Sequence, residues 1–387
     1  RTVVVNGARN ESGGGKAVIL CEQGPEGAPA LFQAPLRLVL ASEAAEVAPA
    51  LAALDAARAA GHWVAGYLCY EAGYALEPRL AHLIPAVRRG PLLAFGIYAA
   101  PTDAGPVLAQ AAAAEGGISP PEPMMSRDTY EAAFALVKGY IAAGDCYQIN
   151  LTFPMRARLR GSALGLYGHL RARQAVEHGG FADLGVGPVV ISRSPELFFT
   201  CDGDGLLVAR PMKGTAPRDA DAGRDAGLAL ELQASEKARA ENLMIVDLLR
   251  NDIARIAKVG SVKVPELYVV ESYTTVHQMV SRVQGQLADA GSMATLMTAL
   301  FPCGSVTGAP KIRAMEIIRE VEPAPRGVYC GAFGWMAPDG RAAFNVTIRT
   351  LSVRGDEVEM NVGGAVVHDS TAEGEWEEAL WKARFAQ

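Results

Sequence analysis

Apolar residues recur at helical spacing in several parts of the chain. Between Ser126 and Gly144 they follow steps of three and four residues, so the pattern predicts a helix that Ser126 caps and Gly144 ends. Residues 235–258 show the same periodicity, residues 41–60 are alanine-rich, and "EGEWEEALWKARFA" (373–386) predicts a final helix. The chain is therefore expected to contain several helices of ordinary length.

Alternating and β-branched stretches between these helices predict strands. "CYQINLTFPMRARL" (146–159) and "YVVESYTTVHQMVSRVQGQL" (268–287) each predict one strand, and residues 328–366 predict mostly hairpins. Because turns rather than regular crossover helices join most of the strands, the predicted fold class is α+β with antiparallel sheets.

Residues 187–215 predict two strands joined at the turn "DGDG". On that interpretation, the segments around Glu196 and Lys213 lie on neighbouring strands. Lys213 is bracketed by Pro211 and Gly214, residues that fix a backbone path rather than build a solvated helix face. Local sequence leaves three roles open for this lysine: a surface charge, an anion contact or a nucleophile.

The strongest glycine and proline break in the chain is "GGISPPEP" (116–123). We interpret it as a connection between an N-terminal region, residues 1–115, and a main catalytic region, residues 124–387. The two regions are expected to contribute to one compact unit.

Composition narrows the classes of partner. Half of the 387 residues are apolar, a fifth are charged and the net charge is −6, with basic residues scattered along the chain. A nucleic-acid-binding protein usually shows a basic stripe, so this class is disfavoured. No stretch approaches the roughly 20 apolar residues of a membrane span, and the N-terminus lacks the pattern of a secretion signal.

The six cysteines are widely spaced and form no C-x-x-C pair. This spacing is poor for a disulfide framework and for a zinc site, so buried thiols in a reducing cytoplasm are expected.

"GSVTGAPK" (304–311) is similar to a phosphate-binding loop but differs in spacing, because three residues rather than four separate its glycines. It is either a plain loop before a helix that begins near Pro310, or a glycine-rich turn whose backbone N–H groups favour a carboxylate.

Carboxylates on two predicted helices form a candidate metal site. Glu375, Glu378 and Lys382 are spaced by three and four residues and so share one stripe, and Glu241 lies near the start of another helix. Such a set either holds Mg²⁺, which takes few protein oxygens, or consists of solvated glutamates and ordinary Glu–Lys pairs.

Three further residues are ambiguous from local sequence. Arg349, in an alternating strand, either faces solvent or grips a carboxylate, and Glu196 is similarly undecided. A lone histidine such as His277 is more often structural than catalytic. None of the cysteines lies in a G-x-C-x-G elbow, which excludes a glutaminase of the cysteine-nucleophile type within this chain.

Taken together, the motifs of the chain resemble those of the chorismate-utilising enzymes, a family that includes anthranilate, aminodeoxychorismate, isochorismate and salicylate synthases. The segments that carry the resemblance are "GYLCYEAGY", "GDCYQINLT", "SRSPELFF", "RPMKGTAPR", "AENLMIVDLLRNDIARIAKVGSVKVPEL", "FPCGSVTGAPKIRAMEIIRE", "YCGAFGW", "TIRTL" and "DSTAEGEWEEALWKAR". It runs from about Gly66 to the C-terminus. It implies two large antiparallel β-sheets packed as a sandwich, with helices around the outside.

The resemblance also implies the parts of a site for chorismate, a dianion. By resemblance, Glu241 and Glu378 hold a Mg²⁺ that bridges to the ring carboxylate, with Glu375 close by. The residues that match substrate-binding positions are Arg349, Tyr329 and Gly331 for the enolpyruvyl carboxylate, Lys382, Gly363 and Gly364 around the ring carboxylate and metal, and Thr307 and Gly308 at a helix start. Such a substrate requires cations and oriented N–H groups.

Two positions depart from the family pattern. Several relatives carry a catalytic histidine where Gln278 stands, whereas His277 is one residue earlier and is expected on the opposite face of the strand. Many relatives also have a glycine at the position of Ala365.

Lys213 indicates the branch of the family. "PMKGT" resembles the P-I-K-G-T motif of aminodeoxychorismate synthases, whereas anthranilate synthases resemble P-I-A-G-T. The resemblance implies that Lys213 attacks C2 of chorismate and expels the C4 hydroxyl, that Glu196 acts as general acid–base, and that ammonia then attacks C4. It implies a separate glutamine amidotransferase subunit as the ammonia source, and a product that leads to p-aminobenzoate and folate.

Two alternatives remain open at this point. One is another enzyme of the family, of anthranilate or isochorismate type, in which Lys213 is an anion contact or a base. The other is a non-catalytic regulatory protein that binds chorismate or tryptophan on the same fold.

Overall fold

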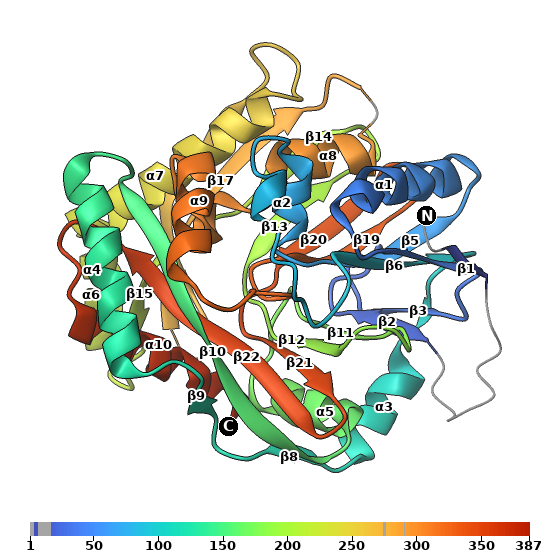
Figure 1. Ribbon diagram of the computed structural model, residues 1–387, viewed down its shortest axis with the longest axis horizontal. Coiled ribbons are helices and arrows are strands. Elements are labelled where there is room, and N and C mark those ends of the chain that lie inside the picture. The colour runs from blue at the N-terminus through green and yellow to red at the C-terminus, as the bar shows by residue number, and fades with distance from the viewer. Residues whose placement is uncertain (1–3, 7–16, 274–275, 290) are drawn as a thin grey trace.

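The computed structural model describes residues 4–6, 17–273, 276–289 and 291–387. Its strands form two large sheets, and every pairing between the described strands is antiparallel (Figure 1). With helices added to both, the predicted α+β class is confirmed.

Sheet 1 carries strands from both ends of the chain. In spatial order its strands are β1 (Val4–Asn6), β4 (Arg37–Ala41), β6 (Leu93–Tyr98), β5 (Trp63–Leu68), β19 (Ala332–Met336), β20 (Ala342–Val346), β13 (Leu197–Cys201), β14 (Leu206–Ala209) and β17 (Val276–Gln286). Strand β15 (Met212–Pro217) continues β14 along the same side of β17, and β16 (Lys263–Ser272) pairs with the other side of β17.

Sheet 2 is equally mixed in sequence. Its order is β18 (Gly308–Ala309), β10 (Gln148–Gly161), β22 (Glu357–Val366), β21 (Thr350–Arg354), β12 (Val189–Ser192), β11 (Gly180–Asp183), β2 (Val18–Cys21), β3 (Ala30–Gln33) and β7 (Thr102–Asp103), with β8 (Gly116–Ile118) and β9 (Glu122–Pro123) on β10. Strands from before and after residues 116–123 therefore lie in both sheets.

Ten helices of the described chain accompany the sheets. They are α1 (Ala44–Ala59), α2 (Ala72–Leu76), α3 (Gly105–Ala113), α4 (Arg127–Ala143), α5 (Ala163–Arg173), α6 (Ala222–Ala234), α7 (Glu236–Ala254), α8 (Met293–Leu300), α9 (Lys311–Val321) and α10 (Ala372–Lys382). Short 3₁₀ turns occupy Ala81–Leu83, Gly304–Val306 and Ala383–Ala386. Within the described ranges, none of the helices has the length and apolar character needed to cross a membrane.

Helix α4 has the ends that the sequence predicts. The Ser126 hydroxyl accepts a hydrogen bond from the Thr129 N–H at 3.2 Å, and Gly144 ends the helix with a φ of 80°. A side-chain cap satisfies an N–H group that has no partner inside the helix, and glycine adopts the left-handed conformation without strain from a Cβ atom.

Helix α10 is held against the rest of the molecule by an aromatic cluster. The Trp376 ring stacks on Phe153 of β10 with centroids 4.6 Å apart, and Tyr130 of α4 contacts both rings. Burial of these large rings fixes the rotation of α10 about its axis. The opposite stripe of the helix, which carries the glutamates and Lys382, therefore faces away from this aromatic cluster.

Residues 116–123 connect the parts of the chain before and after them, and they also form two short strands, β8 and β9, which pair with β10. One prediction was wrong. Residues 268–287 are not one strand, because β16 ends at Ser272, β17 begins at Val276, and the two strands pair antiparallel. Residues 274–275 lie outside the described chain.

Glu196 and Lys213 lie on neighbouring strands, as the sequence predicts. The turn after Cys201 pairs β13 with β14, and Glu196 directly precedes β13. Strands β14 and β15 follow one another along the same side of β17, while β16 occupies its other side. Arg210 and Pro211 interrupt this line only briefly, because the Pro211 carbonyl still accepts the Ser281 N–H at 3.1 Å.

Candidate active site

A pocket of about 490 Å³ lies where the two sheets meet helices α7 and α10. Ten of the thirteen residues predicted for the site line it: Lys213, Glu196, Arg349, Tyr329, Gly363, Gly364, Lys382, Glu241, Glu375 and Glu378. Glu196 and Arg349 both occupy points where the chain passes from one sheet to the other, between β12 and β13 and between β20 and β21. The junction of the sheets thus brings together groups that are far apart in the sequence.

Lys213 lies on β15, packed closely against α7. Gly214 has a φ of 91°, and a Cβ atom there would lie 2.9 Å from the Ala238 Cβ. The Gln278 amide donates to the Gly214 carbonyl at 2.9 Å and accepts from the Thr215 hydroxyl at 3.1 Å. These contacts hold the backbone on the C-terminal side of the lysine in one position.

The environment of Lys213 favours its neutral form. Burial is the main cause that lowers the pKa of its ammonium group below the usual 10.5, and the nearby charge of Lys382 lowers it further. The carboxylates of Glu196, Glu241 and Glu378 oppose this shift. A neutral lysine amine is the form that can act as a nucleophile.

Glu196 is 5 % exposed and has a raised pKa, because burial disfavours its charged form. A hydrogen bond from Ser305 and the charge of Lys213 offset part of this effect. Its Oε1 atom has no hydrogen-bond partner among the described residues. A buried carboxyl with a raised pKa and one free oxygen is suited to proton transfer.

Arg349 is a cation without a counter-ion in the described parts of the chain. Its backbone has a φ of 47°, unusual for a residue with a side chain, and its carbonyl accepts the Arg193 N–H at 2.9 Å. Burial lowers the pKa of its guanidinium. Together with the buried Tyr329, this unpaired guanidinium forms a site for an anion.

The stripe of α10 approaches β22 at a glycine. A Cβ atom on Gly364 would lie 2.9 Å from Glu375 Oε2 and 3.4 Å from both Glu378 Oε1 and Lys382 Nζ. Lys382 donates to the Gly363 carbonyl at 2.9 Å and pairs with Glu378 at 2.7 Å. The glycine pair therefore lets three charged groups converge on one point of the pocket wall.

The carboxylates fit the requirements of Mg²⁺ in type and in number. Burial and the charge of Glu378 raise the pKa of Glu375, so two acidic groups repel each other where a divalent cation would stabilise both. Glu241 faces them from α7 across the same pocket. The residues that the structure places include no preformed group of three or more metal-ligating side chains. Mg²⁺ does not require such a group, because it commonly takes only one or two protein carboxylates.

Three predicted residues do not line the pocket: Thr307, Gly308 and Gly331. The Thr307 hydroxyl donates to the carbonyls of Cys303 and Gly304. A Cβ on Gly308 would lie 2.1 Å from the Gln148 carbonyl, and one on Gly331 would lie 2.0 Å from that of Leu68. These residues shape and pack the backbone near the site.

Gln278 faces the pocket, whereas the adjacent His277 lies on the other face of β17, as alternation along a strand predicts. The His277 ring contacts the Ser272 hydroxyl at 2.7 Å and Asp225 at 2.9 Å, outside the pocket. Ser305 and Asn361 also line the pocket, although the sequence did not predict them there. The position of Ser305 inside "GSVTG" was the one available signal for these two residues.

Comparisons with known proteins agree with this geometry. The family model described as chorismate binding enzyme matches residues 28–387. The chain is 43% identical over 258 residues to aminodeoxychorismate synthase component 1 of Escherichia coli and 40% identical over 259 residues to anthranilate synthase component 1 of Pseudomonas aeruginosa. Each match covers 67% of the chain, and the chain spans only 56% and 52% of those relatives.

Solved structures confirm the fold. Anthranilate synthase component I from Streptococcus pneumoniae superposes with a TM-score of 0.75 at 24% identity, covering 98% of this chain and 94% of that one. The menaquinone-specific isochorismate synthase from Escherichia coli gives 0.72 at 16% identity, with 100% and 94% covered. The predicted pair of antiparallel sheets with surrounding helices is thus the architecture that these enzymes share. From the family match over nearly its whole length, the chain belongs to the chorismate-binding enzymes.

Proposed function

We propose that the chain converts chorismate and ammonia to 4-amino-4-deoxychorismate, as component I of an aminodeoxychorismate synthase. The observation that carries the proposal is Lys213, a partly buried lysine of lowered pKa in the pocket. Identities of 43% and 40% to the two kinds of synthase do not separate them. Lys213 favours aminodeoxychorismate synthase over anthranilate synthase, because the motif of anthranilate synthases resembles P-I-A-G-T and has no amine at this position.

Binding of the substrate dianion is assigned to the cations of the pocket. The unpaired guanidinium of Arg349 and the Tyr329 hydroxyl receive the enolpyruvyl carboxylate. Lys382 and the backbone at Gly363 and Gly364 lie beside the ring carboxylate. These groups are already placed, so they lose little freedom when the substrate arrives.

In the first step, the neutral Lys213 amine attacks C2 of the ring and forms a C–N bond. The two ring double bonds shift to C1=C6 and C4=C5, and the C4–O bond breaks. Glu196 gives its proton to the departing hydroxyl, which leaves as water. The raised pKa of Glu196 keeps this proton available near neutral pH.

In the second step, ammonia attacks C4. The double bonds return to their original positions and the bond between C2 and the lysine nitrogen breaks. Lys213 departs as a neutral amine, and the product carries the new ammonium group at C4. Glu196 then takes up a proton from solvent, which restores the starting state, and the enolpyruvyl group is retained throughout.

Mg²⁺ is proposed as the cofactor, held by Glu241 and Glu378 with Glu375 close by. When bound, it would neutralise charge on the substrate carboxylate. Each of the three residues lines the pocket, and their crowding is the physical support for a cation.

Ammonia is proposed to come from a separate glutamine amidotransferase subunit, as the name "component 1" of the relatives suggests. The product would lead to p-aminobenzoate and folate. We place the reaction in the cytoplasm, a compartment that keeps thiols reduced, since all six cysteines are free and buried.

Incubation of the purified protein with chorismate, Mg²⁺ and an ammonium salt, followed by chromatography and mass spectrometry, tests the proposal. 4-Amino-4-deoxychorismate should accumulate. Fluorescent anthranilate or isochorismate as the main product would assign the chain to another branch of the family. A lack of Mg²⁺-dependent turnover would favour a binding protein.

A further inference from the structure

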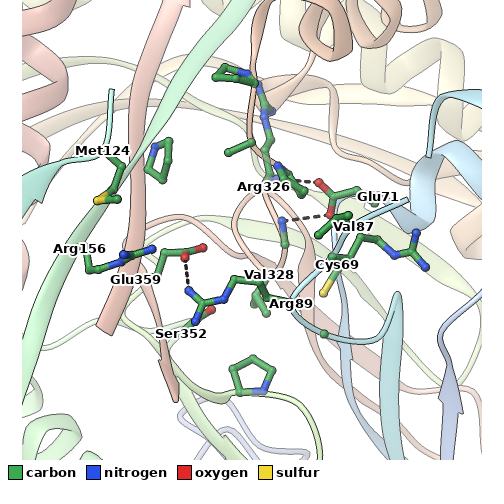
Figure 2. Close-up of a pocket in the computed structure, with 18 of the residues that line it drawn as sticks. Cys69, Glu71, Val87, Arg89, Met124, Arg156, Arg326, Val328, Ser352 and Glu359 are labelled. Atoms are coloured by element: carbon green, nitrogen blue, oxygen red, sulfur yellow. Dashed lines mark hydrogen bonds and ion pairs between the residues drawn. The ribbon is translucent and has the colours of Figure 1, made fainter. Parts of the chain in front are cut away.

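A second cavity, of about 520 Å³, lies away from the candidate active site and shares none of its lining residues (Figure 2). Its walls come from β10, β21 and β22 of sheet 2 on one side, and from the segments 87–92 and 323–328 on the other. Its volume falls within the range of small-molecule sites in proteins.

The middle of this cavity is apolar. Its walls include Met125, Pro154, Pro188, Pro325 and Val328, and Figure 2 shows Met124 and Val87 on opposite sides of the open space. Val87 is 83 % exposed and Met124 is 48 % exposed. Exposed apolar side chains facing each other across a hollow indicate a site that a ligand covers.

Positive charge gathers at one end of the cavity. Arg89 pairs with Glu357 and with Glu359, the latter at 2.9 Å, and Arg156 lies 3.6 Å from Glu357. Arg354 adds a third guanidinium, so this end has three positive charges against two carboxylates. Figure 2 shows Arg156 and Glu359 side by side there, across the cavity from Glu71.

Arg354 is the unpaired member of this group. Its Nε donates to the Arg89 carbonyl at 3.0 Å, and no carboxylate of the described chain lies within ion-pair distance of it. Burial and the charge of Arg89 lower the pKa of its guanidinium. Its remaining N–H groups are the available donors for an anion.

The opposite end of the cavity holds a carboxyl group, that of Glu71. Both oxygens of Glu71 are occupied by backbone N–H groups, those of Arg326 at 2.6 Å and Gly327 at 3.0 Å. Burial raises the pKa of Glu71 to about 7. A carboxylate ligand would therefore turn its charged end toward Arg354 and away from Glu71.

We propose that this cavity binds a small carboxylate with an aromatic or bulky aliphatic body, with the carboxylate on Arg354 and the body between the proline, methionine and valine walls. Residues 326–328 form part of the cavity wall, and the next residue, Tyr329, lines the candidate active site. A ligand here thus contacts the segment that carries a residue of the other pocket.

Three probes with one apolar body and different charges test the proposal: 2-naphthoate, 2-naphthylmethanol and 2-naphthylmethylamine. Calorimetric titration of the whole chain should show naphthoate binding about tenfold or more tightly than the alcohol, since a hydrogen bond to a charged group adds roughly that factor. The amine should bind most weakly. Equal affinities for the three probes would overturn the assignment of the charge.

Single-residue variants of the chain show at which site naphthoate binds. Arg354→Met should remove the preference for naphthoate over the alcohol, and Ala324→Phe, which fills the apolar part, should weaken both. Arg349→Met, in the candidate active site, is the matched control and should change neither. Loss of naphthoate binding in Arg349→Met, with binding retained in both other variants, would place the probe in the active site and overturn the proposal.

These titrations contain no chorismate. Their failure would leave the proposed amination untouched, and failure of the amination would leave this site untouched.

Discussion

The candidate active site and the cavity beside Arg354 have nearly the same volume, about 490 and 520 Å³, but they hold their charges differently. In the candidate active site, Glu196 is buried and Lys213 is partly buried, and desolvation shifts the pKa of each toward the neutral form. In the second cavity, Arg89 and Arg156 are partly exposed and paired with glutamates. Volume therefore does not identify a reactive site; buried titratable groups with shifted pKa values do.

A buried ion pair stands between the two cavities. Arg326, 3 % exposed, pairs with Glu322 at 2.7 Å and lies over the Tyr70 ring at 4.5 Å. It also donates to the carbonyls of Val306 and Asn150, which line the candidate active site. The segment that separates the cavities is thus held by a buried charge.

Replacing the proposed nucleophile should have the largest effect. Lys213→Ala should lower the rate of chorismate amination by at least ~10³-fold, because the covalent route is lost. Chromatography of the products measures this. Lys263→Ala, on the exposed edge strand β16, is the matched control and should retain the wild-type rate. An alanine variant as active as wild type would show that the lysine is not the nucleophile.

The Arg326–Glu322 ion pair between the cavities should contribute far more to stability than the partly exposed ion pairs of Arg89 in the second cavity. Arg326→Met leaves the buried Glu322 carboxylate without its counter-ion and should lower the free energy of unfolding by about 3–5 kcal/mol. Arg89→Met removes a partly exposed pair and should cost about 1 kcal/mol or less. Urea denaturation of the two variants measures both, and equal losses would contradict the contrast.

The third prediction concerns proton transfer. Lys213 must be neutral, so activity rises with pH through its lowered pKa; Glu196 must be protonated, so activity falls as pH passes its raised pKa. The profile of kcat/KM against pH should be bell-shaped. Glu196→Gln should lower kcat by about 10²-fold or more and abolish the limb that Glu196 causes. Persistence of both limbs in this variant would assign that limb to another group.

Local features of the fold could be predicted from the sequence because their causes are local. The ends of α4 follow from Ser126 and Gly144, and the shared stripe of Glu375, Glu378 and Lys382 follows from helical periodicity. Such patterns depend on residues within one or two turns of each other.

Pairings between distant segments could not be predicted in the same way. The pairing of β14 and β15 with β17, which aligns the strand that carries Lys213, joins segments that are far apart in the sequence. For Gly308 and Gly331, the family resemblance predicts a place at the substrate; the structure adds that each lies where two backbones approach closely. Nothing in the sequence indicated the second cavity, because Arg354 and Val87 belong to distant segments that line one cavity only in the folded chain.

The most direct test of the central claim is mass spectrometry of the protein mixed with chorismate and Mg²⁺, without ammonia, and quenched rapidly. The account predicts an adduct of chorismate less one water on the peptide that contains Lys213, discharged when ammonium is added. Consumption of chorismate with an adduct on another residue, or with the Lys213 peptide unmodified at every time point, would contradict it.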